Sequence, residues 1–166
     1  MSLIPFDALS DEARLWCFGA SRSLDATQTV RLFDSMRSFL AEWTAHRQDL
    51  LAGFAWMHER FLLVGVDEYG AGASGCSIDA LSGHLRAVGG ELDLDLLDSM
   101  PVWFRDVSGH IRTVSRAEFT DLSQGGEVSA STPVFDLTLT RLADLHAGRL
   151  ETAAGNAWHR GLLTAD

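Results

Sequence analysis

The sequence of 166 residues contains no lysine, and all 13 of its basic residues are arginine. A phosphate-binding loop of the G-x-x-x-x-G-K type requires a lysine, as do a Schiff base, a pyridoxal-phosphate anchor and a Ser–Lys dyad. The sequence therefore excludes these four kinds of site. The chain also contains 23 acidic residues, so that its formal net charge is −10. Because phosphate neutralisation supplies most non-specific affinity for nucleic acid, nucleic-acid binding is not predicted.

Cysteine is also scarce: the chain has only Cys17 and Cys76, so no disulfide framework is predicted. No hydrophobic run approaches the ~18 residues of a membrane span. The first residues lack the basic and apolar regions of a secretory signal. We therefore predict a cytoplasmic, bacterial-type protein without a membrane segment. The length and the 46 % hydrophobic content fit a globular domain with an extension.

Hydrophobic spacing predicts a strand, a helix and a hairpin in the first part of the chain. The apolar segment 13–19 is typical of a short strand. Asp25 and Gln28 have the spacing of a capping box, and apolar residues then recur at helical spacing for about 20 residues. Two apolar runs at 50–57 and 61–66, separated by a short polar break, predict a β-hairpin.

A second helix is predicted after the hairpin. A glycine-rich loop occupies residues 67–75, and apolar residues at helical spacing follow from Cys76. The pair Gly89 and Gly90 is expected to end this helix or to fray its last turn.

The remaining residues alternate between apolar and polar segments. Residues 101–105 and 111–114 predict two strands joined by a turn, and a second capping box begins a short helix at 115–122. Residues 123–133 are polar and glycine-rich, which is typical of a linker. The tail 134–166 is predicted to be mainly helical, although part of it also fits an alternating strand.

The order strand, helix, strand, strand, helix, strand predicts an α+β, ferredoxin-like βαββαβ fold: an antiparallel sheet with helices on one face. We assign this domain to residues 1–122, a linker to 123–133, and a C-terminal extension to 134–166 that packs on the domain or on a partner subunit. Both hairpin strands are apolar on both faces, so a one-sided helical layer would leave apolar residues exposed. Either the tail covers the second face, or a second subunit does so in a homodimer through the sheet face.

This topology brings two distant segments to the same end of the sheet. One is the junction between the first helix and the hairpin, and the other is the loop before the second helix. The resulting predicted cluster consists of Trp43, His46, Asp67, Glu68, Ser74, Cys76 and Ser77.

Cys76 lies in the first turn of the predicted helix, where free amides and the helix dipole lower the pKa of a thiol. With His46 as the base and loop amides as an oxyanion site, the pair predicts a thiol-dependent enzyme in which Cys76 is the nucleophile. The alternative is that Cys76 is a small residue packing the helix start. Asp67 and Glu68 form an acid–base pair or half of a cation site only if the strand has already ended, because adjacent strand residues point to opposite faces.

The loop also matches a dinucleotide-binding fingerprint, Gly70-x-Gly72-x-x-Gly75. However, it follows a hairpin strand instead of a strand of a parallel βαβ unit, and two acidic residues before it would repel a pyrophosphate. No cofactor is therefore predicted, and a small anion bound to the amides of residues 75–77 fits better. The six histidines and two cysteines are scattered, so no metal site is predicted.

At these residues the sequence resembles a small family of uncharacterised bacterial proteins. The resemblance lies in Trp43-Thr44-Ala45-His46, in Arg60-Phe61, and in Val66-Asp67-Glu68 followed by Ala73-Ser74-Gly75-Cys76-Ser77-Ile78-Asp79, with weaker matches at Val134-Phe135 and Trp158-His159. It covers roughly residues 12–160 and departs from the family pattern around 149–156. Some members carry the label transporter ATPase, which a chain without lysine does not support. The resemblance implies no assigned activity.

Three hypotheses about function follow. The first is a domain that binds a small anionic ligand or a partner at the loop containing Ser74, Gly75 and Ser77. The second is the thiol-dependent enzyme, and the third is a structural or assembly protein. Trp158, near the chain end, either closes the predicted cluster or docks the terminus.

Overall fold

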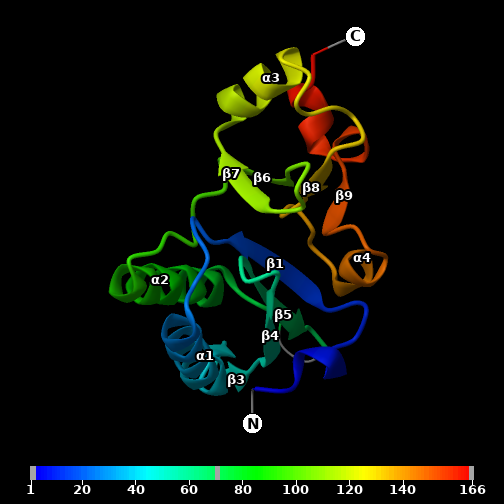
Figure 1. Ribbon diagram of the computed structural model, residues 1–166. Helices are drawn as coiled ribbons and strands as arrows, with labels where there is room; N and C mark the ends of the chain where they lie inside the picture. Colours follow the sequence, from blue (N-terminus) through cyan, green and yellow to red (C-terminus); the bar gives the residue numbers. More distant parts are fainter. Residues whose placement is uncertain (1–2, 70–71, 165–166) are drawn as a thin grey trace.

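The computed structural model describes residues 3–69 and 72–164, which form two stacked lobes (Figure 1). The first lobe contains an antiparallel sheet of order β1-β5-β4, built from β1 (Arg14–Gly19), β4 (Leu51–Met57) and β5 (Phe61–Asp67). The predicted hairpin is confirmed, because β4 and β5 pair along their whole lengths. His58 and Glu59 in its turn have positive φ. The mixed α+β class is also confirmed.

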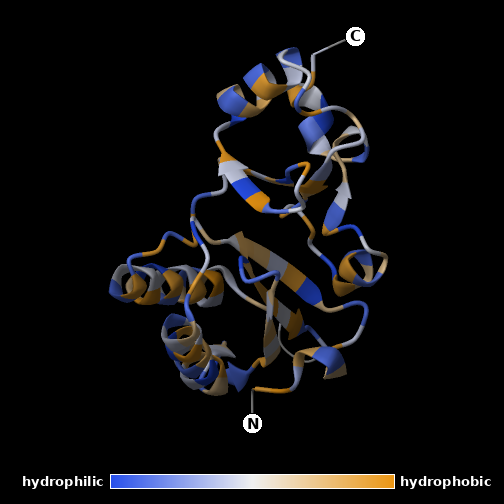
Figure 2. Ribbon diagram, in the orientation of Figure 1, coloured by the Kyte–Doolittle hydropathy of each residue, from blue (hydrophilic) through white to orange (hydrophobic). Residues whose placement is uncertain are grey.

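Two helices, α1 (Ala26–Ala41) and α2 (Gly75–Leu92), cover one face of this sheet (Figure 1). The predicted capping box of α1 is present: the backbone N–H of Gln28 donates to the Asp25 carboxylate, and the backbone N–H of Asp25 donates to the Gln28 side chain. The strands that the helices cover are mostly hydrophobic (Figure 2). The helix side chains that are buried against these strands are Leu32, Met36, Leu40, Leu81, Leu85 and Val88.

A small hairpin of β2 (Thr44–Ala45) and β3 (Gln48–Asp49) connects α1 to β4. The two residues of its turn, His46 and Arg47, both have positive φ, which matches the right-handed twist of a two-residue hairpin.

The prediction that the glycine pair ends α2 is wrong, whereas its alternative, a frayed last turn, stays a prediction. The helix continues to Leu92, and Asp93 closes it with φ 51° in the left-handed region. Gly89 is needed for a different reason: the backbone N–H of Leu94 folds back to donate to the Gly89 carbonyl at 2.8 Å. A Cβ on Gly89 would lie 2.5 Å from the Leu94 carbonyl oxygen, so the helix end requires glycine there.

The two glycines are therefore expected to respond oppositely to alanine. Gly89→Ala should destabilise the protein by about 1–3 kcal/mol, because the new methyl group meets backbone that must move. Gly90→Ala should be neutral or stabilise by up to about 1 kcal/mol, because nothing lies within 4 Å of its Cβ and alanine favours helix. Urea denaturation of the two variants checks this. Equal effects would contradict the close approach at Gly89.

The second lobe contains a separate sheet of order β7-β6-β8-β9. Its elements, with the accompanying helices, are β6 (Val102–Arg105), β7 (Ile111–Val114), α3 (Arg116–Gln124), β8 (Pro133–Phe135), α4 (Leu142–His146) and β9 (Glu151–Ala153). Three short 3-10 helices complete the described chain: η1 (Phe6–Ala8), η2 (Ala154–Asn156) and η3 (Trp158–Leu162). The predicted strand pair and the capping box that begins α3 are all present.

The ferredoxin-like strand order is not confirmed. The order β1-β5-β4 matches its first three strands, but β6, expected as the fourth, belongs to the second sheet. The edge of β1 that would receive it is taken by the tail: the N–H of Leu15 donates to the Thr140 carbonyl, and the N–H of Leu142 donates to the Ala13 carbonyl. The strand expected as the fourth, β6, therefore pairs with β7 and β8 in the second sheet.

The tail is less helical than expected. It contributes β8 and β9 to the second sheet and only five residues to α4. Strands before and after the segment 123–133 pair with each other, and Val128 within it is buried. The division at 122 and 133 stays a prediction.

Aromatic side chains join the two lobes. Phe61 of β5 is fully buried between Phe135 of β8, at 4.5 Å between ring centroids, and Trp103 of β6, at 6.2 Å. Leu139, Leu142 and Leu150 of the tail pack into the same cluster. The second face of the first sheet is thus covered within the chain. Among the described residues, no helix combines the length and hydrophobicity needed to cross a membrane.

Candidate functional site

Part of the predicted cluster does come together at the start of α2. The indole N–H of Trp43 donates to the carbonyl of Ser77 at 2.9 Å in the buried interior. Ser74 caps the helix by accepting from the N–H of Ser77 at 3.2 Å, and the Ser77 hydroxyl donates back to the Ser74 carbonyl. These polar groups satisfy one another, so their arrangement holds the helix start in place.

The two acidic residues of the cluster have separate partners. Asp67 is buried at the end of β5, and its carboxylate accepts from both the backbone N–H and the hydroxyl of Ser10. Glu68 accepts from the N–H of Ala73 at 3.2 Å and lies 3.7 Å from the Arg14 guanidinium. Each carboxylate therefore anchors a different neighbouring segment. Gly70 of the glycine motif lies outside the described residues.

Cys76 and His46 are both exposed. Cys76 lies in the first turn of α2, and His46 lies in the β2–β3 turn with φ 51°. Within the described ranges, the two side chains share no hydrogen bond. Their partnership as nucleophile and base stays a prediction.

A different site lies between the lobes. A cavity of about 480 Å³ opens where β1 meets the second lobe, beside the segment that connects α2 to β6. Its apolar walls include the aromatic side chains of Trp103, Phe135 and Trp158. Its polar lining comes from Asp98, Ser99, Arg116 and Thr138. This size and lining are typical of small-molecule sites.

Gly19, the last residue of β1, makes room for one wall. A Cβ there would lie 2.5 Å from the Trp103 ring and 2.8 Å from Leu137, so only glycine lets the indole approach the strand this closely. The Trp103 N–H donates to the Ala20 carbonyl at 3.1 Å, which fixes the ring. The hydrogen bond and the close contact with Gly19 therefore hold this wall in place.

Arg116 begins α3 and presents a charge at the cavity. Its Cζ lies 4.7 Å from the centroid of the Trp158 ring, and its Nε donates to the Met100 carbonyl at 3.1 Å. In the part of the chain that the structure describes, the two terminal nitrogens have no hydrogen-bond partner. They remain available to an anionic group.

Trp158 also contacts His159. The two rings stack at 4.0 Å with an interplanar angle of 26°. His159 is fully buried, and neither ring nitrogen has a hydrogen-bond partner among the described residues. Burial lowers the pKa of His159 to about 4; Asp136 opposes this shift, and the charge of Arg116 adds to it. Arg116 and a neutral His159 thus both pack against the Trp158 ring.

The edge of β1 adds backbone groups to the cavity. Because the N–H of Leu15 points to the tail, alternation along the strand directs the N–H and C=O of Cys17 the same way. Burial, with a smaller effect of Asp136, raises the pKa of the Cys17 thiol to about 12. Cys17 therefore lines the cavity as a neutral thiol at physiological pH.

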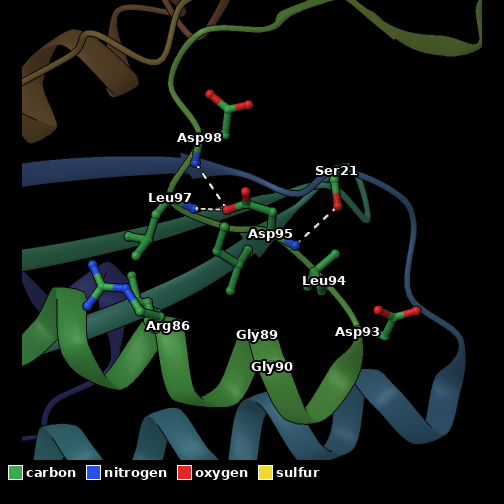
Figure 3. A pocket seen from close by; sticks show the side chains of 11 residues that line it. Ser21, Arg86, Gly89, Gly90, Asp93, Leu94, Asp95, Leu97 and Asp98 are labelled. Carbon is green, nitrogen blue, oxygen red and sulfur yellow. Dashed lines mark hydrogen bonds between the residues drawn. The ribbon is translucent and has the colours of Figure 1, made fainter.

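A larger and more open groove of about 700 Å³ is lined by the last turns of α2 and by the connecting segment (Figure 3). Asp95 accepts there from the N–H groups of Leu97 and Asp98, and its own N–H donates to the hydroxyl of Ser21. Asp98 points away from Arg86 (Figure 3). These bonds shape the connecting segment.

Sequence reasoning missed the cavity because its walls come from β1, β6, β8, α3 and η3. Of its residues, only Trp158 carried a signal, as an aromatic side chain near the chain end. Trp158 packs in the second lobe and not against the predicted cluster. In the described ranges no group of three or more His, Cys, Asp or Glu side chains is arranged to hold a metal ion.

Comparisons with protein-family models, with curated proteins and with solved structures gave no match to this chain.

Proposed function

We propose that the protein binds a small, largely aromatic molecule carrying one anionic group in the cavity between its lobes. The observation that carries this proposal is the pairing of aromatic walls with the Arg116 guanidinium, whose terminal nitrogens are unpartnered among the described residues. Aromatic walls recognise a flat apolar body, and a guanidinium recognises a carboxylate or a similar anion. Because the aromatic walls and the guanidinium are already held in position, the entropic cost of ordering the site on binding is reduced.

The other polar groups define the ligand further. Asp98 lines the same cavity, and a second negative charge on the ligand would be repelled by its carboxylate. The backbone of Cys17 offers a donor and an acceptor along the β1 edge. We therefore expect a molecule with one negative charge and a hydrogen-bonding group at its other end.

The loop before α2 and the Cys76–His46 pair supply the alternatives. The amides at the loop would hold a small anion, and the pair would make the protein a thiol-dependent enzyme. The contacts of Trp43, Ser74 and Ser77 support a structural role for that region. We therefore place the ligand between the lobes.

Arg116→Gln should raise the dissociation constant of an aromatic anion about tenfold or more, because a charge-assisted hydrogen bond contributes about 1.5–3 kcal/mol. The fluorescent probe 1-anilinonaphthalene-8-sulfonate, titrated into the folded protein, measures this. Arg31→Gln is the matched control, because Arg31 is an exposed residue of α1 and its substitution removes the same charge. Arg116→Lys should keep part of the affinity. Equal weakening by Arg116→Gln and Arg31→Gln would refute the site.

A further inference from the structure

We propose that the free edge of β4 pairs with the same strand of a second copy of this chain. The two strands would run antiparallel about a twofold axis through Ala55, so that the two first-lobe sheets become one continuous sheet. The inference rests on the backbone of β4, on its side chains and on the distribution of charge, and it is independent of the cavity between the lobes.

The backbone of β4 presents unpaired groups outward. The strand lies at the edge of its sheet, with β5 on one side only. The carbonyl of Ala52 accepts from the N–H of Ile4 at 2.8 Å, so Ala52 faces away from β5. Alternation then turns the N–H and C=O groups of Phe54 and Trp56 outward as well. In residues 3–69 and 72–164, no backbone group bonds to these two on the outer side.

The edge already receives a strand at one end. Leu3 pairs with Ala52 in a parallel bridge, which shows that the outer side of β4 is open to strand pairing. Pro5 and η1 then lead the N-terminal segment away, and the backbone of Phe6 passes against Gly53. The ladder therefore stops before Phe54, where a second strand would continue it.

The side chains of β4 do not protect this edge. Exposed edges usually carry charged residues, proline or a bulge that prevents pairing with another chain. The strand reads Leu-Ala-Gly-Phe-Ala-Trp-Met, without a charge or a proline, and it pairs with β5 without a bulge. An apolar, regular edge of this kind is expected to be covered in the native assembly.

The open part of the edge is self-complementary. With the axis at Ala55, Phe54 of one copy lies opposite Trp56 of the other, and the two pairs exchange up to about four hydrogen bonds. A hollow of about 400 Å³ beside the edge, lined by Phe33, Phe54 and Trp56, is placed to receive an apolar side chain of the partner. Trp56, whose buried indole nitrogen has no partner among the described residues, is one of the lining residues.

Charge favours this edge over the rest of the surface. Two copies with a net charge of −10 repel each other over most of their surfaces. Neither β4 nor the lining of the hollow includes an acidic residue, and the one charged lining residue is Arg37. A second copy therefore meets the least repulsion here. Both faces of the sheet are covered within the chain, so the edge takes the place of the sheet-face dimer, which was one of the two alternatives from the sequence.

Sedimentation velocity from micromolar to near-millimolar concentration tests the proposal, with Phe54→Pro and Phe54→Ala as a matched pair. Both variants lose the aromatic ring, but only proline removes the outward N–H, which the pairing with β5 does not use. The wild type should form dimers. Phe54→Pro should weaken association at least about tenfold relative to Phe54→Ala, since two hydrogen bonds are lost per dimer.

Hydrogen exchange of the wild type provides a test that needs no variant. The amides of Phe54 and Trp56 should exchange slowly in the dimer and faster on dilution. A protein that stays monomeric at the highest concentration would overturn the proposal. So would a dimer in which these two amides exchange as fast as in the monomer.

Discussion

Replacing Phe61 with alanine should lower the free energy of unfolding by about 3–5 kcal/mol, the range found for large aromatic side chains in protein cores. Phe61 has no exposed surface, and its ring contacts Phe135 and Trp103 of the other lobe. Truncation would leave a void where the two lobes meet. The packed interior around it can collapse only partly, so the loss exceeds the transfer energy of the ring alone.

Phe33→Ala is the matched control for this prediction. Phe33 lies on α1, is partly exposed and packs edge-on against Phe54, so its truncation should cost clearly less. Urea denaturation followed by tryptophan fluorescence measures both variants. Phe61→Ala should also weaken binding of the aromatic probe, because Trp103 and Phe135 lose their support. A loss for Phe61→Ala no larger than that for Phe33→Ala would show that the lobes do not depend on this contact.

Acid should destabilise the protein through His159. Its pKa is about 4 in the folded state against 6.5 for the free side chain. Between these values the unfolded chain binds a proton that the folded chain does not, so the free energy of unfolding falls as the pH falls through this window. The complete shift corresponds to about 3 kcal/mol, lost by pH 4 and fully regained above pH 6.5.

His159→Phe removes this titration and keeps an aromatic ring between Trp158 and Phe119. The variant should match or exceed the wild type in stability at pH 7, because two unpaired buried nitrogens are removed. Its advantage should grow by about 3 kcal/mol on going to pH 4. His110→Phe, at a side chain that is 82 % exposed, is the matched control for the loss of a histidine outside the core. Parallel pH profiles for wild type and His159→Phe would contradict a buried neutral histidine.

Local patterns in the sequence predicted the local elements well. The capping boxes of α1 and α3 and the β4–β5 hairpin depend on residues within a few positions of one another. The role of Gly89 cannot be predicted from such local patterns. Its role is a close approach to the Leu94 carbonyl across the helix end, and a glycine required by packing looks the same in sequence as a glycine that ends a helix.

These local patterns do not predict which strands that lie far apart in the sequence pair with each other. The edge of β1 was open to either β6 or the tail, and the tail occupies it through Thr140 and Leu142. Once β6 joins the second sheet, Trp103 is brought against Gly19, and the cavity follows. Trp43 and Ser77, two members of the predicted cluster, lie in contact because their meeting depends only on the first lobe, whereas the role of the cluster as a binding site stays a prediction. The position of Arg116 beside Trp158 depends on how the chain end packs on α3, which no spacing in the sequence indicates.

The central claim is that an aromatic anion binds between the lobes, and the five tryptophans offer a direct test. The protein is labelled with 15N, its indole N–H resonances are assigned by single substitutions, and 1-anilinonaphthalene-8-sulfonate is added. The resonances of Trp103 and Trp158, which line the cavity, should shift and saturate together, while those of Trp16, Trp43 and Trp56 stay in place. A shift confined to Trp43 would place the ligand at the start of α2, and a shift confined to Trp56 would place it at the β4 edge. Either result, or no shift at all, would contradict the binding site proposed here.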